Sequence, residues 1–156
     1  MPNLISNRYF LVKSWNHDNV VQSQSDGLWA TQTHNTPILA KAFSQCRASN
    51  PPSDVILIFS VNKSGAFQGY AVMTSLPGAA PDPKWTQKLH WTCGQPFFIE
   101  WVTTGHVLFR ECGHIKNRLN KDGVDLSVVV GRDGQEIDPY AGRELLRVID
   151  NLSHKL

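Results

Sequence analysis

One segment restricts the fold more than any other, the apolar run DVILIFSV at 54–61. A continuous apolar run of this length is typical of a strand that is buried on both faces of a sheet. The sequence NKSG at 62–65 predicts a tight turn, and AFQGYAVMT at 66–74 predicts the returning strand of a hairpin. The chain therefore has to build a sheet around residues 54–61.

The remaining sequence predicts elements that can complete this sheet and cover it. Strand patterns lie at 8–14, 96–104 and 125–130, and helical patterns lie at 16–24, 35–46 and from 138 onward. About six strands and three to four helices, unevenly interleaved, indicate an α/β (α+β) domain. Its sheet is expected to be mixed and curved, or closed into an open barrel.

Helix ends are marked by residues with a known physical preference. Asn16 is expected to cap the first helix with its side-chain oxygen, and Gly27 is expected to end it. Thr36, followed directly by a proline, is expected to cap the second helix. Asp138, also followed by a proline, is expected to start the last one.

The length of 156 residues predicts one domain over residues 8–154, preceded by a disordered lead at 1–7. No run approaches the roughly 18 apolar residues of a membrane span, and the N-terminus does not have the pattern of a signal peptide. Three cysteines that lie far apart suit free thiols in a reducing compartment. We expect an intracellular domain that is a monomer in isolation and does not bind membranes.

The net charge of +2 and pI of about 8.5 allow an anionic partner, but a protein that wraps a duplex is usually more basic. The unusual count is that of tryptophan, at positions 15, 29, 85, 91 and 101. Two of the five lie in the stretch 75–96, which is rich in proline. A long irregular loop within a small domain is usually functional or disordered, and tryptophans argue against disorder. The loop is therefore a candidate site.

Several blocks resemble the YTH domain in their order and spacing. They are RYFLVKSWNHDNV at 8–20, GLWAT at 27–31, VILIFSVNKSGAFQGYA at 55–71, FFIEW at 97–101 and GRDGQEI at 131–137. The resemblance covers about residues 8–152. It implies a YTH/PUA-like curved sheet flanked by helices, and binding of single-stranded RNA that contains N6-methyladenosine. It also implies a reader in mRNA processing or regulation. A polyadenylation-factor type of parent protein would favour the nucleus over the cytoplasm.

The resemblance also implies roles for individual residues. The modified base would lie in a cage of Trp29, Trp85 and Trp91, with Cys93 as an alternative third wall. The base edge would be read by Asn19 and by backbone groups of Ser14, Trp15 and Ala30. RNA backbone contacts would come from Lys13, Arg132, Asp133, Asn117 and Arg118.

Three positions depart from the family pattern. Trp15 stands where the family often has Asn or Tyr, so this ring could stack on a neighbouring base or close the pocket. The family's Asn-Pro-aromatic-Asn segment is Asn117-Arg118-Leu119-Asn120 here, and Val129 stands where a basic residue is common. These departures affect the expected path of the flanking nucleotides more than they affect the cage.

The chemistry of the modified base explains why tryptophans suit it. N6-methyladenine is neutral, so a cage holds it by stacking and desolvation, and stacking gives about 1–3 kcal/mol per base. Burying one methyl adds about 0.8 kcal/mol, so stronger discrimination requires a pocket shaped to the methyl. The amide of Asn19 can donate to a ring nitrogen, and the Ala30 carbonyl can accept the remaining amine N–H.

Three other functions compete with this interpretation. Cys93, Cys112 and His114, with His90 and His106, suggest a metal or thiol enzyme. However, no Cys-x-x-Cys pair, P-loop, Rossmann fingerprint or nucleophile elbow is present, so we expect no catalysis, metal or cofactor. A YTH-like module that binds an unmodified RNA motif remains open. So does a protein-interaction module that uses exposed tryptophans.

Overall fold

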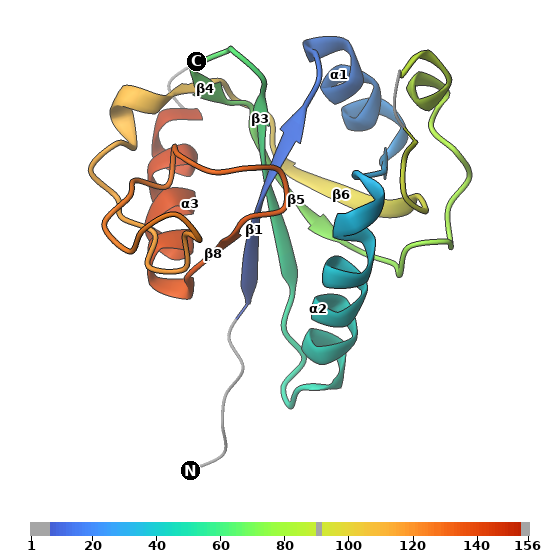
Figure 1. Cartoon of the computed structure of the whole chain (residues 1–156), viewed down its shortest axis with the longest axis horizontal. Coiled ribbons are helices and arrows are strands. Elements are labelled where there is room, and N and C mark those ends of the chain that lie inside the picture. Colours follow the sequence, from blue (N-terminus) through green and yellow to red (C-terminus); the bar gives the residue numbers. More distant parts are fainter. Residues whose placement is uncertain (1–6, 90–91, 154–156) are drawn as a thin grey trace.

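A computed structural model describes residues 7–89 and 92–153. Its main sheet has six strands in the order β2-β6-β5-β3-β1-β8 and is curved, as Figure 1 shows. These strands are β1 (Arg8–Ser14), β2 (Leu28–Trp29), β3 (Val55–Val61), β5 (Gly69–Met73), β6 (Phe97–Thr103) and β8 (Glu136–Ile137). Two short strands, β4 (Ala66–Phe67) and β7 (Val107–Leu108), form a second sheet. Among the described strands, β1 and β3 are the one parallel pair, so the expected mixed sheet is confirmed.

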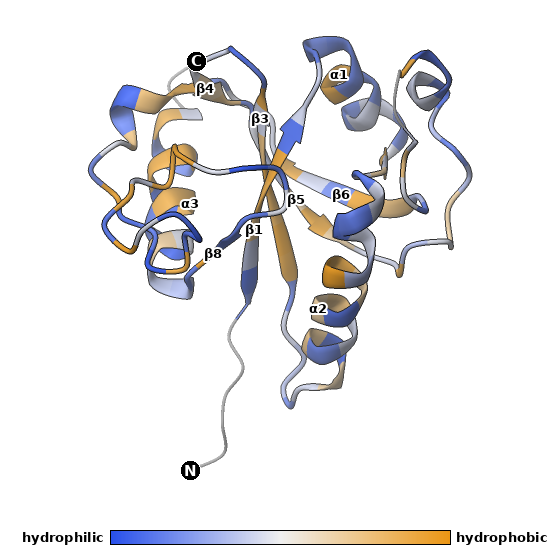
Figure 2. Ribbon diagram, viewed as in Figure 1, coloured by the Kyte–Doolittle hydropathy of each residue, from blue (hydrophilic) through white to orange (hydrophobic). Residues whose placement is uncertain are grey.

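Strand β3 lies at the centre of the sheet, and every one of its residues is buried. Leu57 and Phe59 pack into one apolar cluster, while Ile56 and Ile58 pack into a second cluster on the other face. Figure 2 shows this concentration of apolar residues along the central strands. The continuous apolar run therefore forms the doubly covered strand that its pattern predicts.

The described residues contain three α-helices, α1 (His17–Asp26), α2 (Thr36–Ala48) and α3 (Pro139–Ser153). Helices α1 and α2 contribute to the cluster around Phe59, and α3 contributes to the cluster around Ile58. They therefore cover opposite faces of the sheet, as Figure 1 shows. Short 3-10 helices are η1 (Thr33–Asn35), η2 (Lys84–Lys88) and η3 (Phe109–Glu111).

The predicted helix ends are confirmed at α1 and α3, but not at α2. The Asn16 side chain accepts a bond from the Asn19 N–H at 2.9 Å, and Gly27 ends α1 with φ of 70°. Asp138 Oδ1 accepts from the Ala141 N–H at 2.9 Å. Thr36 is instead the first residue of α2, because η1 runs directly into that helix. The helix caps therefore follow local preference unless a neighbouring turn extends the helix.

The strand predicted at 125–130 is wrong. This segment forms turns, and its only bridge within the described residues pairs Ser127 with Lys116. Val128 is buried, whereas Val124 and Val130 are exposed, so one valine anchors a loop. The predicted return strand at 66–74 is also interrupted, because Gln68 bonds back to the Val61 N–H between β4 and β5. In both places, side-chain bonds replace a continuous ladder.

No helix within residues 7–89 and 92–153 has the length and the apolar character that crossing a bilayer requires.

Candidate functional site

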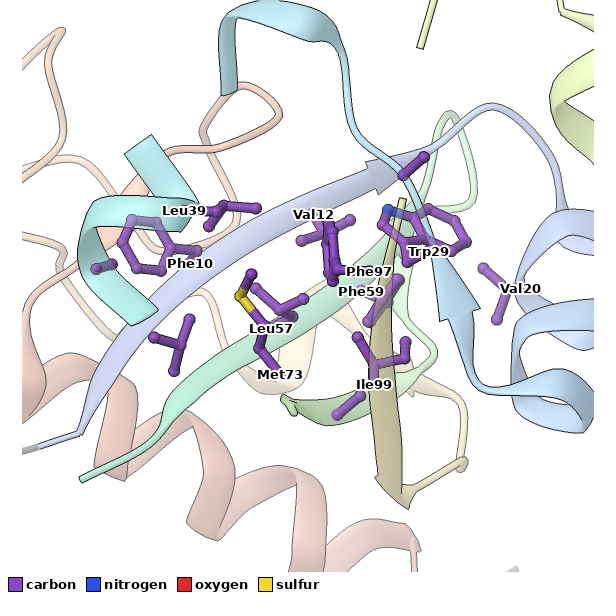
Figure 3. Packing of buried hydrophobic residues seen from close by; sticks show 14 of the residues in the cluster. Phe10, Val12, Val20, Trp29, Leu39, Leu57, Phe59, Met73, Phe97 and Ile99 are labelled. Carbon is purple, nitrogen blue, oxygen red and sulfur yellow. The ribbon is translucent and has the colours of Figure 1, made fainter. Parts of the chain in front are cut away.

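The fold brings together two tryptophans that lie far apart in the sequence. Trp29 is on β2 and Trp85 is on η2, and their ring centroids are 4.8 Å apart with planes inclined at 46°. Trp29 also packs edge-on against Phe59 at 4.8 Å. Figure 3 shows Trp29 at one end of the apolar cluster, beside Phe59 and Phe97. The two rings thus join the core to the irregular segment between β5 and β6.

A cavity of about 260 Å³ lies between α1 and η2, next to this pair. Trp85 and Leu89 line it from the η2 side. Trp15, Asn19 and Gln22 line it from the α1 side. The segments that form it are separated by about sixty residues of sequence, so only the tertiary structure creates the cavity. Figure 1 shows the loop that carries η2 beside α1.

Two polar residues that line this cavity make no side-chain hydrogen bond within the described residues, and one of their groups, Trp85 Nε1, is fully buried. Asn19 is 4% exposed, and its side-chain amide makes no hydrogen bond there. Trp85 is also 4% exposed, and its Nε1 has no acceptor. An unmatched buried donor or acceptor costs about 1–3 kcal/mol, so such groups are rare and usually have a functional cause. The cavity lining therefore combines an aromatic ring with polar groups that are not bonded to other described residues.

A third tryptophan provides a comparison. Trp101 was expected in the core, and it is partly buried with its ring 4.4 Å from that of Phe59. Its Nε1 donates to Ser23 Oγ at 3.0 Å. An indole whose N–H is bonded in this way needs no ligand, whereas the N–H of Trp85 does.

The backbone groups expected at the base edge are also available. Neither the Ala30 nor the Trp15 peptide groups have a hydrogen-bond partner among the residues described. Ser14 is buried, its Oγ donates to the Asn16 carbonyl at 2.7 Å, and its own carbonyl accepts from Asn62 at 2.8 Å. These two hydrogen bonds of Ser14 therefore fix the backbone next to Trp15.

Lys13 and the 132–133 loop are joined by a hydrogen bond from the Lys13 N–H to Asp133 Oδ1 at 2.8 Å. Asp133 Oδ2 accepts from the Asn35 side chain at 3.1 Å. Burial raises the pKa of the Asp133 carboxyl, and these two bonds oppose the rise. Burial also lowers the pKa of the Lys13 ammonium, against the attraction of Asp133. Asp133 thus makes its contacts within the protein, while Arg132 is exposed.

A larger cavity of about 320 Å³ lies at this loop and is lined by His34, Lys121 and Arg132, among others. It shares no lining residue with the cavity between α1 and η2. Its buried side chains, such as Asn35 and Gln135, are hydrogen-bonded within the protein. A third cavity, of about 600 Å³, is lined by Gln32, Thr33, His34 and Thr92, so size does not select the cavity between α1 and η2. What distinguishes that smaller cavity is the unpaired N–H of its lining residue Trp85.

Asn117 and Arg118 are not among the residues lining either cavity. Asn117 is buried, donates to the Glu136 carbonyl at 3.0 Å and accepts from the Asp138 N–H at 3.0 Å. The Arg118 side chain is exposed, and its peptide N–H donates to Asp138 Oδ2 at 2.9 Å. Asn117 therefore supports the loop, and Arg118 presents a cation that forms no salt bridge with another described residue.

Of the two candidates for a third cage wall, only Cys93 lies within the described residues. Trp91 lies outside the described residues. Cys93 forms a bridge with Gln32 and packs against the cluster that contains Trp29. Burial raises the pKa of the Cys93 thiol to about 11, so it is neutral near pH 7. No cluster of three or more potential metal ligands occurs within the described residues.

Sequence reasoning did not identify Gln22, Lys88 and Leu89 as lining residues. Lys88 and Leu89 belong to the proline-rich segment, which was recognised as a candidate site only as a whole. Gln22 has no local signal, because a polar residue on a helix is usually solvated.

Known proteins are similar to this chain in both sequence and fold. A model of the YT521-B-like (YTH) domain family matches residues 7–150. The zinc finger CCCH domain-containing protein 45 of Oryza sativa is 37% identical over 91% of this chain. The 30-kDa cleavage and polyadenylation specificity factor 30 of Arabidopsis thaliana is 36% identical over 92% of it. The chain spans 20% and 22% of the lengths of these two relatives, respectively.

Among solved structures, the Toxoplasma CPSF4 YTH domain in complex with a 7-mer m6A-modified RNA superposes with a TM-score of 0.79. It is 32% identical, and the match covers 93% of this chain and 92% of that one. The overall fold of this chain is therefore also the fold of that relative, whose structure contains an m6A-modified RNA.

Proposed function

The chain belongs to the YTH domain family, and on this basis we propose that it binds single-stranded RNA containing N6-methyladenosine. The cavity between α1 and η2 receives the modified base. The RNA-binding unit is residues 8–154, and it acts as a reader without catalysis. The setting is mRNA processing, including polyadenylation, in the nucleus or the cytoplasm.

The observation that carries this proposal is the chemistry of the cavity wall. Trp85 and Asn19 line the cavity, and the ring of Trp29 packs against that of Trp85 with centroids 4.8 Å apart. Aromatic faces supply stacking for a base, and the amide supplies a donor and an acceptor for its edge. A neutral heteroaromatic ligand satisfies both requirements, because it needs no counter-charge.

The base reaches the tryptophan faces only when η2 moves. Trp29 is 2% exposed and Trp85 is 4% exposed, so neither face is open to a ligand in this conformation. The Lys84–Lys88 helix carries Trp85 and has only short-range 3-10 bonds, such as the one from Thr86 to Pro83. Outward movement of η2 separates the rings and lets the Trp85 N–H meet water or ligand.

Polar groups around the opened cage give selectivity for adenine. The Asn19 amide bonds a ring nitrogen, and the peptide groups of Ala30 and Trp15 meet the base edge. The methyl group lies against Trp85 and the third wall, which Trp91 or the Cys93 region provides. A base with a different edge leaves one of these buried groups unmatched, at a cost of about 1–3 kcal/mol.

The RNA backbone is held by cations on β1 and on the surrounding loops. Lys13 and Arg132 contact phosphates, and Arg118 offers a further positive charge. Asp133 positions the first two, since its carboxylate bonds to the Lys13 N–H and adjoins Arg132. Asn117 positions Arg118 through the loop. Phosphate contacts make affinity fall as the salt concentration rises.

The test is a titration of two short single-stranded RNAs that differ by one N6-methyl group, at fixed salt. Transfer of one methyl gives about fourfold discrimination, and a shaped cage should exceed that factor. Trp29→Ala should remove the preference. Trp29 is buried, so the fold of this variant is checked by thermal unfolding, and Asn19→Ala serves as a second variant. Equal binding of both RNAs by a folded wild-type protein contradicts the proposal.

A further inference from the structure

Trp15 is exposed, yet the chain on both sides of it is fixed. Its side chain is 62% exposed, against 2% for Trp29 and 4% for Trp85. On one side, Ser14 is buried and bonded to the carbonyl of Asn16. On the other, Asn16 caps α1. A large apolar ring held on a fixed stem in water is costly for the free protein but pre-organised for a partner.

Trp15 has no aromatic or cation–π partner among the described residues. Its ring lines the cavity between α1 and η2 together with Asn19 and Trp85. A ligand bound at Asn19 and Trp85 therefore has Trp15 at its edge. The next unit of a polymeric ligand comes within reach of the indole face.

The charges at the rim distinguish the base of that unit from its phosphate. Asp18 and Asn16 line the cavity beside Trp15, and Lys88 lines it from η2. A carboxylate repels a phosphate, whereas an ammonium attracts one. The ring of a nucleotide is therefore favoured near Trp15, with its phosphate toward Lys88.

We propose that Trp15 is the stacking platform for the nucleotide adjacent to the modified base. This inference rests on the proposed function and adds a specificity-determining residue to it. A base that stacks on the indole ring makes no hydrogen bond through its edge to that ring. Trp15 therefore accepts any base and favours those that stack most strongly. It lengthens the footprint from one nucleotide to two.

The experiment compares ligands with and without that neighbour. The ligands are N6-methyladenosine nucleoside, a five-nucleotide RNA with central N6-methyladenosine, and two copies with an abasic residue on the 5′ or the 3′ side. The proteins are wild type, Trp15→Ala, Trp15→Phe and the control Tyr140→Ala. Tyr140 is an exposed aromatic residue on α3, which covers the opposite face of the sheet.

Trp15→Ala keeps the peptide groups of residue 15, so it should weaken binding of the intact RNA about 5- to 150-fold more than it weakens binding of the nucleoside. Trp15→Phe should retain most of the affinity, and Tyr140→Ala should retain all of it. One abasic RNA should bind the wild type more weakly by a similar factor and show no further loss with Trp15→Ala. This non-additivity identifies both the stacked neighbour and its side.

Three results would overturn the inference. Equal losses for nucleoside and RNA would make Trp15 a wall of the base pocket. A loss that persists with both abasic RNAs would make it a backbone contact. No loss with any ligand would leave its exposed ring to a protein partner. Failure of the proposed function is recognised separately, since the wild type would then bind methylated and unmethylated five-nucleotide RNAs equally.

Discussion

Residues 109–138 and the described residues 75–89 and 92–96 have little regular structure, but the two segments differ in how their polar groups are satisfied. In the first segment, the buried side chains of Asn117, Asn120 and Gln135 each bond to peptide groups of the same segment. In the second, Trp85 is buried, its N–H has no partner within the described residues, and its side chain lines a cavity together with Asn19.

The difference teaches how to separate a structural loop from a binding loop. A loop that satisfies its own buried groups is stable without a ligand, because no desolvation cost remains. A loop that leaves them unpaired gains that energy only when a ligand arrives. Substitutions in the two segments should therefore affect different quantities, namely stability in the first and affinity in the second.

The largest expected effect is on stability. Asn117→Ala leaves the Glu136 carbonyl and the Leu119 and Asp138 N–H groups without their side-chain partner. The free energy of unfolding should fall by about 3 kcal/mol, since each orphaned buried group costs about 1–3 kcal/mol and water will reach some of them. Urea unfolding measures the fall. The ratio of affinities for methylated and unmethylated RNA should not change in the folded fraction; a changed ratio would place Asn117 at the ligand.

The next effect is on affinity. Asn19→Ala removes an amide that forms no hydrogen bond with another described residue, so the affinity for methylated RNA should fall by about 1–3 kcal/mol. Its unfolding free energy should stay the same or rise by a few tenths of a kcal/mol, since Ala is the better helix former. Gln24→Ala, at a partly buried position of the same helix, is the control. If Asn19→Ala lost much stability but kept its affinity for methylated RNA, Asn19 would be a structural residue, which contradicts the prediction.

A smaller effect is expected at the indole N–H. Trp85→Phe keeps an aromatic ring but removes the donor, so the free protein loses no hydrogen bond and should lose about 1 kcal/mol from reduced packing. Trp101→Phe breaks its bond to Ser23 and should destabilise the protein more. Thermal unfolding of the two variants makes the comparison. Equal losses would show that the Trp85 N–H has a partner in solution.

The smallest effect concerns pH. Burial raises the Asp133 pKa, so between the unfolded-state and folded-state pKa values the native protein binds more protons than the unfolded chain. Stability should therefore fall as pH rises through that window, and Asp133→Asn should remove this part of the slope. Unfolding of both proteins from pH 4 to pH 8 tests it. A wild-type curve that falls no more steeply than that of the variant contradicts the prediction.

Much of the fold could be predicted where local physics decides it. The apolar run became the central strand, and Asn16 and Gly27 bound α1 as their chemistry requires. Local preference failed where a distant partner competed. Asn35 bonds to Asp133 across the fold, and η1 extends into α2, so Thr36 is not a cap. The valines at 128–130 suit a strand, but no continuous neighbour is available to pair with them.

The same distinction between local and distant effects applies to the candidate site. The sequence by itself determined which residue types are present, and family resemblance identified Trp29, Trp85 and Asn19 as candidates. Only the tertiary structure decided which of them meet, which polar groups remain unpaired, and that Trp15 faces the same cavity. The reason is physical, because propensity and caps act within a few residues of chain. Burial and hydrogen-bond satisfaction depend on groups brought together from about sixty residues away.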